Sequence, residues 1–353
     1  MILYEIFMDA FVDRGFNDLT NKIPYFNELG VDMLWLTPFY KAHSYHGYDI
    51  KSYTEINDKY GSIDDFIKFV NECHKNNIKV IIDLVLAHTS FHHPWFMDSI
   101  NGKNDYYHWR DYEPSEKYST PVSNNSWKIC KLNNKYYLAP WHHDMPALNT
   151  KSQNVRNEFI KIIEFWLDKG IDGFRLDACP YVDIINNDPL EFWRWFSNEC
   201  RKRKSDIYLV GEAWDTYEVS KQYTDVLGHS FNFEMAGYIK WKAENPNVDI
   251  PMNGTENDVY FLSNHDMSRS MTSLHNNVHK MKEALKILFS MPGDIMLYYG
   301  EEIGMKGHID HNNDDKDVRQ KMDWYSVEMQ RKNPNSLFSF TKYLIQERKK
   351  NNR

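Results

Sequence analysis

Short apolar strands alternate with amphipathic helices along most of this chain, and this alternation limits the folds that the chain can adopt. Stretches such as Lys79–Leu84 and Gly173–Leu176 are almost wholly apolar. Strands of this kind lie in a parallel sheet that is covered by helices on both faces. We count eight of them, which predicts an α/β fold of the (β/α)8 (TIM) barrel type. The predicted strands are Ile2–Met8, Val31–Leu36, Lys79–Leu84, Gly173–Leu176, Ile207–Val210, Ser230–Phe233, Val259–Leu262 and Ile295–Tyr298.

The predicted helices between these strands carry recognisable end signals. Ser62 precedes an apolar periodic stretch as its N-terminal cap, and Gly30 stops the helix at Lys22–Leu29. The stretch Asp13–Asn21 is expected to be a polar loop. Further helices are predicted at Ser152–Lys169, Pro189–Lys202, Val278–Ser290 and Leu337–Lys349, with another that ends near Ala243.

The alternation stops between His88 and about Thr150. This stretch is rich in Asn, Tyr, Trp, His and Pro and shows no helical period. A barrel of this type takes about 250 residues, so roughly 100 of the chain remain for insertions. We therefore predict a barrel from residues 1–88 and 151–353, with residues 89–150 as a small irregular domain inserted after the third strand.

Composition excludes several classes of protein. The formal net charge is −8 with acidic and basic residues mixed, which argues against a nucleic-acid partner and suits a neutral ligand. No apolar run approaches the roughly 20 residues of a membrane span.

No signal peptide precedes the first strand, so we expect a cytoplasmic protein. The four cysteines lack paired spacing, so we expect them to be free thiols in a reducing compartment. These cysteines are Cys73, Cys130, Cys179 and Cys200.

The fourth predicted strand delivers an arginine and a carboxylate two residues apart. Arg175 and Asp177 leave a strand on the same face because successive side chains alternate. The guanidinium would hold the carboxylate ionised and fix its position, which suits Asp177 to act as a nucleophile. The alternative is a purely structural Arg–Asp pair at the end of a strand.

Other predicted strands also end in polar side chains. Asp83 and His88 follow the third strand, Glu212 follows the fifth, and His265 and Asp266 follow the seventh. Active sites of parallel α/β barrels lie at the carboxyl ends of the strands. These residues are therefore expected on one rim, where carboxylates with an arginine and histidines suit the cleavage of glycosidic bonds.

The chemistry of glycoside cleavage assigns a role to each carboxylate. Cleavage with retention needs a nucleophile and an acid/base carboxyl group about 5–5.5 Å apart. We assign Asp177 as the nucleophile. Glu212 is assigned as the acid/base, because Trp214 is apolar and no cation is adjacent in sequence. Asp266 would bind ring hydroxyls more tightly in the transition state. His88 and His265 would donate to hydroxyls of the same sugar, and Tyr48 would offer it a stacking face. Trp214 is a further candidate for substrate binding.

The stretches that carry these residues resemble the short sequence regions of the α-amylase family, glycoside hydrolase family 13, and they occur in the family's order. This resemblance implies that Asp177 is the nucleophile, Glu212 the acid/base and Asp266 the transition-state stabiliser, and that the insertion is the family's domain B. It also implies that the rest of the first sugar subsite is formed by Arg175, His88, His265, Tyr48 and Asp83. The matching stretches are Gly30–Pro38, His46–Asp49, Asp83–His88, Met145–Asn149, Gly173–Ala178, Gly211–Trp214, Phe261–Asp266 and Gly293–Gly304.

The chain departs from this family at several places. Pro180-Tyr181 stands where many amylases carry Lys-His on the acceptor side, and Ala147 stands where Asp is usual. The chain also stops where the family's C-terminal β-sandwich begins. That domain is therefore absent from this chain, either because the sequence was cut there or because the enzyme is minimal.

We expect no cofactor and no bound metal. The family often ligates a structural calcium with an Asn at the position of Ala87. Asp13, Asn17 and Asp18 offer oxygens, but they are better explained as turn caps. The pairs His92-His93 and His142-His143 have no third ligand at a recognisable spacing.

Four aromatic residues of the insertion can be interpreted in two ways. They are either stacking platforms for sugar rings or the insertion's own small core, and the sequence favours neither. The residues are Trp127, Tyr136, Tyr137 and Trp141.

The sequence thus predicts a retaining α-glycosidase that hydrolyses α-glucosidic bonds in α-glucans or maltooligosaccharides. One alternative is an enzyme that transfers the glycosyl group to a sugar from the same site. Another is a catalytically idle glycan-binding barrel. A metal-dependent amidohydrolase is disfavoured because Tyr4–Asp13 contains no histidine.

Overall fold

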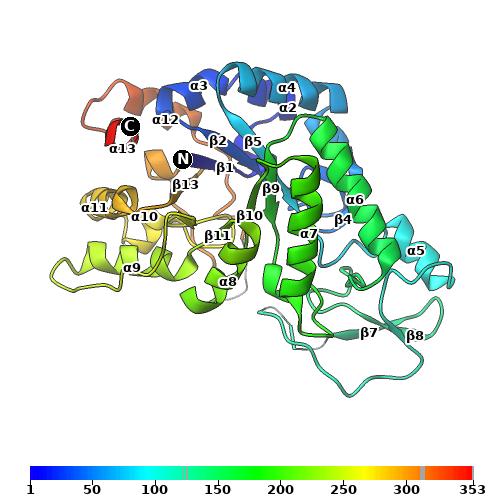
Figure 1. The fold of residues 1–353 in the computed structure, drawn as a ribbon. Coiled ribbons are helices and arrows are strands. Elements are labelled where there is room, and N and C mark those ends of the chain that lie inside the picture. Colours follow the sequence, from blue (N-terminus) through cyan, green and yellow to red (C-terminus); the bar gives the residue numbers. More distant parts are fainter. Residues whose placement is uncertain (122, 125, 311–314, 352–353) are drawn as a thin grey trace.

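Eight parallel strands close into a barrel in the computed structural model of the protein, which describes residues 1–121, 123–124, 126–310 and 315–351 (Figure 1). Each strand overlaps a predicted one, so the (β/α)8 fold is confirmed. The order around the barrel is β1-β13-β12-β11-β10-β9-β5-β2. The strands are β1 (Ile2–Ile6), β2 (Met33–Leu36), β5 (Lys79–Leu84), β9 (Gly173–Leu176), β10 (Tyr208–Gly211), β11 (His229–Phe231), β12 (Asp258–Tyr260) and β13 (Asp294–Tyr298).

The register of three neighbouring strands sets the height at which their polar residues emerge. In the β5–β9 pair Asp83 lies opposite Arg175, and in the β9–β10 pair Gly211 lies opposite Leu176. The residues that follow β9 and β10 therefore leave the barrel at the same level. Gly173 permits this close pairing, because a Cβ atom there would lie 1.8 Å from the Tyr208 carbonyl oxygen.

Helices cover the outside of the barrel (Figure 1). Ser62 caps α4 in a reciprocal capping box with Asp65, as its position before an apolar stretch predicted. None of the described helices is long and apolar enough to cross a membrane. The longer helices are α3 (Ile23–Leu29), α4 (Ile63–Lys75), α6 (Gln153–Asp168), α7 (Pro189–Arg203), α8 (Tyr217–Leu227), α9 (Phe233–Glu244), α11 (Val278–Ser290), α12 (Trp324–Arg331) and α13 (Leu337–Asn351).

The prediction of a polar loop at Asp13–Asn21 is wrong, because this stretch contains helix α2 (Gly15–Thr20). Its two large apolar residues are both buried, and the ring of Phe16 packs edge-on against Phe39 and Phe66. The polar residues between Phe16 and Leu19 face outward, so the sequence shows too few apolar positions to reveal the helical period. The sequence also gave no expectation for α8, α12, or the short helices α1 (Met8–Phe11) and α10 (Ser270–Ser273).

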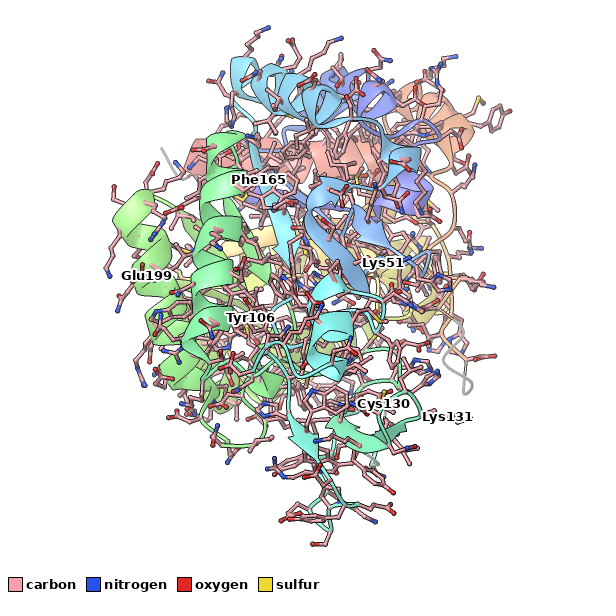
Figure 2. All side chains as sticks on the ribbon, turned by 90° about the vertical axis from the view of Figure 1, so that its right-hand side faces the viewer. Lys51, Tyr106, Cys130, Lys131, Phe165 and Glu199 are labelled. Carbon is pink, nitrogen blue, oxygen red and sulfur yellow. The ribbon has the colours of Figure 1, made fainter. Side chains whose placement is uncertain are left out.

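A small lobe is inserted between β5 and β9, after the third barrel strand as predicted (Figure 2). It is more regular than the sequence indicated. Helix α5 (Pro94–Ile100) is followed by a three-stranded antiparallel sheet of order β6-β8-β7. These strands are β6 (Trp109–Arg110), β7 (Trp127–Cys130) and β8 (Lys135–Leu138).

Most of the insertion's aromatic residues form its own core. Trp127 packs with Leu138, and Tyr136 packs against this cluster. Tyr137 is buried against Phe96 at a ring distance of 5.1 Å. The core reading therefore holds for these three aromatic residues.

A second hairpin rises after β2. Strands β3 (Tyr40–Ala42) and β4 (Ile50–Ile56) pair antiparallel, and the loop between them carries His46–Asp49. Asp49 accepts hydrogen bonds from the amides of His43 and Ser44 at 3.1 Å, which tightens this loop. At the other end of the chain, no β-sandwich follows the barrel among the described residues, which end in α13.

Candidate active site

An open cavity of about 740 Å³ lies at the carboxyl ends of the barrel strands. Asp177, Glu212 and Asp266 all line it, so the structure brings the three predicted carboxylates together. The loop after β2, the insertion and the segment after β13 complete its walls. Other lining residues include His46, Tyr48, His88, Trp141, His142, Tyr181, Trp214, Asp315 and Arg319.

One buried guanidinium group connects the floor of this cavity. Arg175 is only 1% exposed. Its Nη1 atom donates to Asp177 Oδ1 at 2.7 Å and to Asp83 Oδ1 at 2.8 Å. Its Nη2 atom pairs with Glu212 Oε1 at 2.7 Å. Because a guanidinium is small and planar, these three carboxylates lie close to one another.

The expectation that no cation is adjacent to Glu212 is wrong. Arg175 reaches it from the neighbouring strand, a contact that sequence spacing does not show. Trp214 instead stacks on Phe233 at a ring distance of 4.7 Å and is 51% exposed. It therefore lies on the rim of the cavity rather than forming an apolar surrounding for Glu212.

Burial raises the pKa of Glu212, and the charge of Arg175 opposes that rise. The negative charges of Asp177 and Asp266 add to the rise. The Oε2 atom of Glu212 accepts a hydrogen bond from the Ala178 amide at 2.9 Å, which fixes the carboxyl group. The elevated pKa thus comes from burial and like charge, not from an apolar neighbour.

Asp177 shows the same balance. Burial raises its pKa, and the Arg175 guanidinium acts in the opposite direction as predicted, but does not cancel the rise. The charge of Asp266 contributes to the rise as well. The Arg175–Asp177 contact is therefore confirmed, while a net depression of the Asp177 pKa is not.

Asp266 has the opposite electrostatic environment. His265 Nε2 lies 3.0 Å from its Oδ2 atom, and Arg319 Nη2 lies 2.6 Å from its Oδ1 atom. Burial acts to raise the pKa of Asp266, but these two cations outweigh it and hold the pKa well below its usual range. Asp266 is therefore the carboxylate most firmly kept ionised.

His265 is held by a second carboxylate from β1. Its Nδ1 atom lies 2.5 Å from Glu5 Oε1, and both side chains are fully buried. Burial acts to lower the pKa of His265. The negative charges of Asp266 and Glu5 have the larger effect, and they raise this pKa to about 10. The imidazole is thus a cation at neutral pH, fixed between two carboxylates.

Tyr48 and His88 form the remaining wall of this end of the cavity. The Tyr48 hydroxyl donates to Asp83 Oδ2 at 3.0 Å and hydrogen-bonds with His265 Nε2 at 2.7 Å. Its ring stacks on His265 at 5.5 Å. Burial lowers the pKa of His88 to about 4, so this imidazole is neutral at pH 7. Its Nε2 atom lies 3.1 Å from the Tyr48 carbonyl oxygen.

Asp83 lies beneath the cavity rather than on its surface. It is fully buried between Arg175, Tyr48 and Trp35, whose Nε1 atom donates to it at 3.3 Å. Burial raises the pKa of Asp83 to about 7, against the lowering effect of Arg175. Asp83 therefore contacts Arg175 and Tyr48 beneath the cavity, and its role in substrate binding stays a prediction.

Comparison with known proteins agrees with this geometry. The family model described as "Alpha amylase, catalytic domain" matches residues 13–334. The chain belongs to the α-amylase family. Alpha-amylase 3 of Dictyoglomus thermophilum is 33% identical over 99% of this chain and 77% of its own length. The 4-alpha-glucanotransferase of Thermotoga neapolitana is 32% identical over 87% of this chain and 72% of its own.

Solved structures of the α-amylase family are similar over the whole chain. The crystal structure of the α-amylase from H. orenii superimposes with a TM-score of 0.89 at 31% sequence identity. The match covers 99% of this chain and 82% of that one. The family resemblance inferred from short motifs is thereby confirmed over nearly the full length.

Three charged residues of the site were not predicted from the sequence, namely Glu5, Asp315 and Arg319. Arg319 follows β13 in a segment without a strand, where its contact with Asp266 has no local sequence signal. Glu5 did carry a signal, because it is a lone acidic residue within the apolar strand Ile2–Ile6. A carboxylate in such a strand needs a buried partner.

The oxygens considered for a calcium ion do not converge in the structure. Asp13 pairs with Lys321, Asn17 donates to Asp65 at 3.1 Å, and Asp18 pairs with Arg14 at 2.8 Å. His93 is buried and caps α5. Among the described residues, one group of three has ligand atoms close enough to hold a metal ion: His142, His143 and Asp144.

Replacing Glu5 by Gln is expected to lower the pKa of His265, because one of the two carboxylates that stabilise the imidazolium is removed. Titration of the His265 imidazole by NMR measures the change. Because the folded-state pKa of about 10 lies above the ordinary value, the stabilisation from His265 is complete below about pH 6.5. It is lost as the pH rises through that folded-state pKa, and Glu5→Gln should shift this loss to lower pH.

The matched control is Glu302→Gln, which changes a buried glutamate that accepts hydrogen bonds from Tyr4 and Tyr25 rather than from His265. This control should leave the His265 titration in place. An unchanged His265 pKa in Glu5→Gln would show that Glu5 does not hold the imidazole.

Proposed function

We propose that the protein is a retaining α-glycosidase that hydrolyses α-glucosidic bonds in α-glucans or maltooligosaccharides. The observation that carries this proposal is the guanidinium of Arg175, which binds both Asp177 and Glu212 within one cavity. Retention needs two carboxyl groups about 5–5.5 Å apart, whereas inversion needs a wider gap that admits water. Two carboxylates on one guanidinium favour the closer arrangement.

Asp177 acts as the nucleophile in this proposal. Arg175 holds it through Oδ1, which fixes the carboxylate in the cavity where a sugar's anomeric carbon would bind. Glu212 donates its proton to the leaving oxygen, since burial raises its pKa. When Asp177 forms the glycosyl ester it loses its charge, and one cause of the high Glu212 pKa disappears. Glu212 is then better suited to act as the base toward water.

Asp266 stabilises positive charge on the sugar in this scheme. His265 and Arg319 keep it ionised, so it remains anionic as the substrate becomes oxocarbenium-like. His88 contributes as a neutral hydrogen-bond acceptor, since its Nε2 atom donates to the Tyr48 carbonyl oxygen and its Nδ1 atom is buried without a hydrogen-bond partner among the described residues. No step requires a cofactor, so we propose cofactor-free catalysis.

Relatives whose names state an activity support α-linked glucans as the substrate class. One is the alpha-amylase from Dictyoglomus thermophilum, and another is the oligo-1,6-glucosidase of Parageobacillus thermoglucosidasius, which is 30% identical to this chain.

We also propose a cytoplasmic location. The four cysteines are all buried free thiols, and a reducing compartment would keep them in that state.

Asp177→Asn is expected to remove nearly all turnover, because an amide cannot form the glycosyl ester. Glu212→Gln should lower kcat by roughly 10²- to 10⁴-fold, the usual contribution of a general acid. Release of reducing sugar from a maltooligosaccharide measures both.

The control for these variants is Asp215→Asn, a change to an exposed carboxylate three residues after Glu212. It should retain wild-type turnover. Normal hydrolysis by Asp177→Asn would refute the assignment. Wild-type protein that binds maltooligosaccharides without turnover would instead support the idle glycan-binding alternative.

The acceptor side of the cavity favours a second candidate, transfer of the glycosyl group to a sugar. Tyr181 meets Trp141 edge-on at a ring distance of 4.9 Å, and both line the cavity with Trp214. Aromatic faces can bind an acceptor sugar and displace water. The similarity to a 4-alpha-glucanotransferase fits this alternative.

Product analysis with maltotriose separates the two candidates. The hydrolase proposal predicts glucose and maltose as the only products, because water is the acceptor. Oligosaccharides longer than maltotriose would show transfer and would overturn the hydrolase proposal. In that case Tyr181→Ala should reduce the share of transfer products, since it removes part of the acceptor wall.

A further inference from the structure

Three consecutive residues of the insertion present their side chains to one point at the mouth of the cavity. The ligand atoms of His142, His143 and Asp144 all lie within 4.8 Å of one another. His142 Nδ1 is 3.6 Å from Asp144 Oδ2, and His143 Nε2 is 3.3 Å from Asp144 Oδ1. His142 also lines the cavity that contains Asp177 and Glu212.

The turn that carries these side chains is fixed by its surroundings. The Tyr137 hydroxyl donates to the His143 carbonyl oxygen at 2.7 Å, and the Phe91 amide donates to the Asp144 carbonyl oxygen at 2.7 Å. Both bonds tie the turn to aromatic residues of the insertion, the buried Tyr137 and the partly buried Phe91. The arrangement therefore does not depend on the side chains' contacts with one another.

The spacing of these atoms suits a tetrahedral metal ion. Zinc binds imidazole nitrogen and carboxylate oxygen at about 2.0–2.2 Å, so neighbouring ligands in a tetrahedral site lie roughly 3.3–3.5 Å apart. His143 Nε2 lies 3.3 Å from Asp144 Oδ1 and His142 Nδ1 lies 3.6 Å from Asp144 Oδ2, so each imidazole is near that spacing from one oxygen of the same carboxylate. The two histidines are exposed, so their side chains are not locked in place by packing.

The ligand types also select the ion. Two imidazoles and one carboxylate favour a borderline divalent cation over calcium or magnesium, which prefer oxygen ligands. The Asp144 amide donates to His142 Nδ1 at 3.3 Å, so a metal at this nitrogen replaces only a long hydrogen bond.

We propose that His142, His143 and Asp144 bind a divalent cation of the zinc class at the mouth of the cavity, with water as the fourth ligand. The sequence alone predicts no metal here, because it shows no third ligand at a recognisable spacing. Asp144 is that third ligand, because the turn at residues 142–144 places its carboxylate close to both imidazoles.

Isothermal titration of the full chain, free of any affinity tag, with zinc chloride in the absence of substrate tests the binding. Wild-type protein should bind one zinc ion per chain. His143→Ala should weaken binding at least tenfold, and His142→Ala/His143→Ala should abolish it. Cobalt should give the visible absorption of a four-coordinate site in wild type but not in His142→Ala/His143→Ala.

The matched control is His92→Ala, which removes another exposed histidine of the insertion that is not in the group of three. It should bind zinc as wild type does. Equal binding by wild type and the folded single variant His143→Ala, or no binding by wild type at millimolar zinc, would overturn the proposal. Because no turnover is measured, this outcome is separate from failure of the glycosidase assignment.

Discussion

The geometry of the site depends on the ion pairs that the buried guanidinium of Arg175 forms. This group binds Asp83, Asp177 and Glu212, so three carboxylates share a single fixed positive charge. Burying charges is costly unless they are paired and hydrogen-bonded. The rings of Trp35 and Tyr48 lie 5.0 and 5.8 Å from the guanidinium carbon and add cation–π stabilisation. Negative charge still exceeds positive charge here, which favours retention of a proton among the carboxyl groups.

A second cluster next to this one has the opposite balance. His265 and Arg319 supply two positive charges to Asp266, while Glu5 supports His265 from below. The pKa of Asp266 is therefore lowered, whereas the pKa values of Asp177 and Glu212 are raised. Carboxyl groups with separated pKa values can take different roles at one pH. The two clusters supply this separation within one cavity.

Much of the fold and of the site could be predicted from the residues at the strand ends and from the family's motifs. The bounds of Lys79–Leu84 and Gly173–Leu176 matched the structure, because apolar runs between polar ends mark buried strands clearly. Contacts across strands were harder to foresee. The Arg175–Glu212 pair depends on the register of β9 and β10, and Arg319 reaches Asp266 from a segment without periodicity. Helix α2 was missed because only two apolar residues, Phe16 and Leu19, marked its buried face.

The stereochemistry of the reaction tests the central claim most directly. If Arg175 holds Asp177 and Glu212 about 5–5.5 Å apart, hydrolysis of an α-linked maltooligosaccharide proceeds through two displacements. Proton NMR during the first minutes of turnover should then show new reducing ends in the α configuration, before they equilibrate in solution. Initial release of the β anomer would mean that water attacks directly, and would contradict the account.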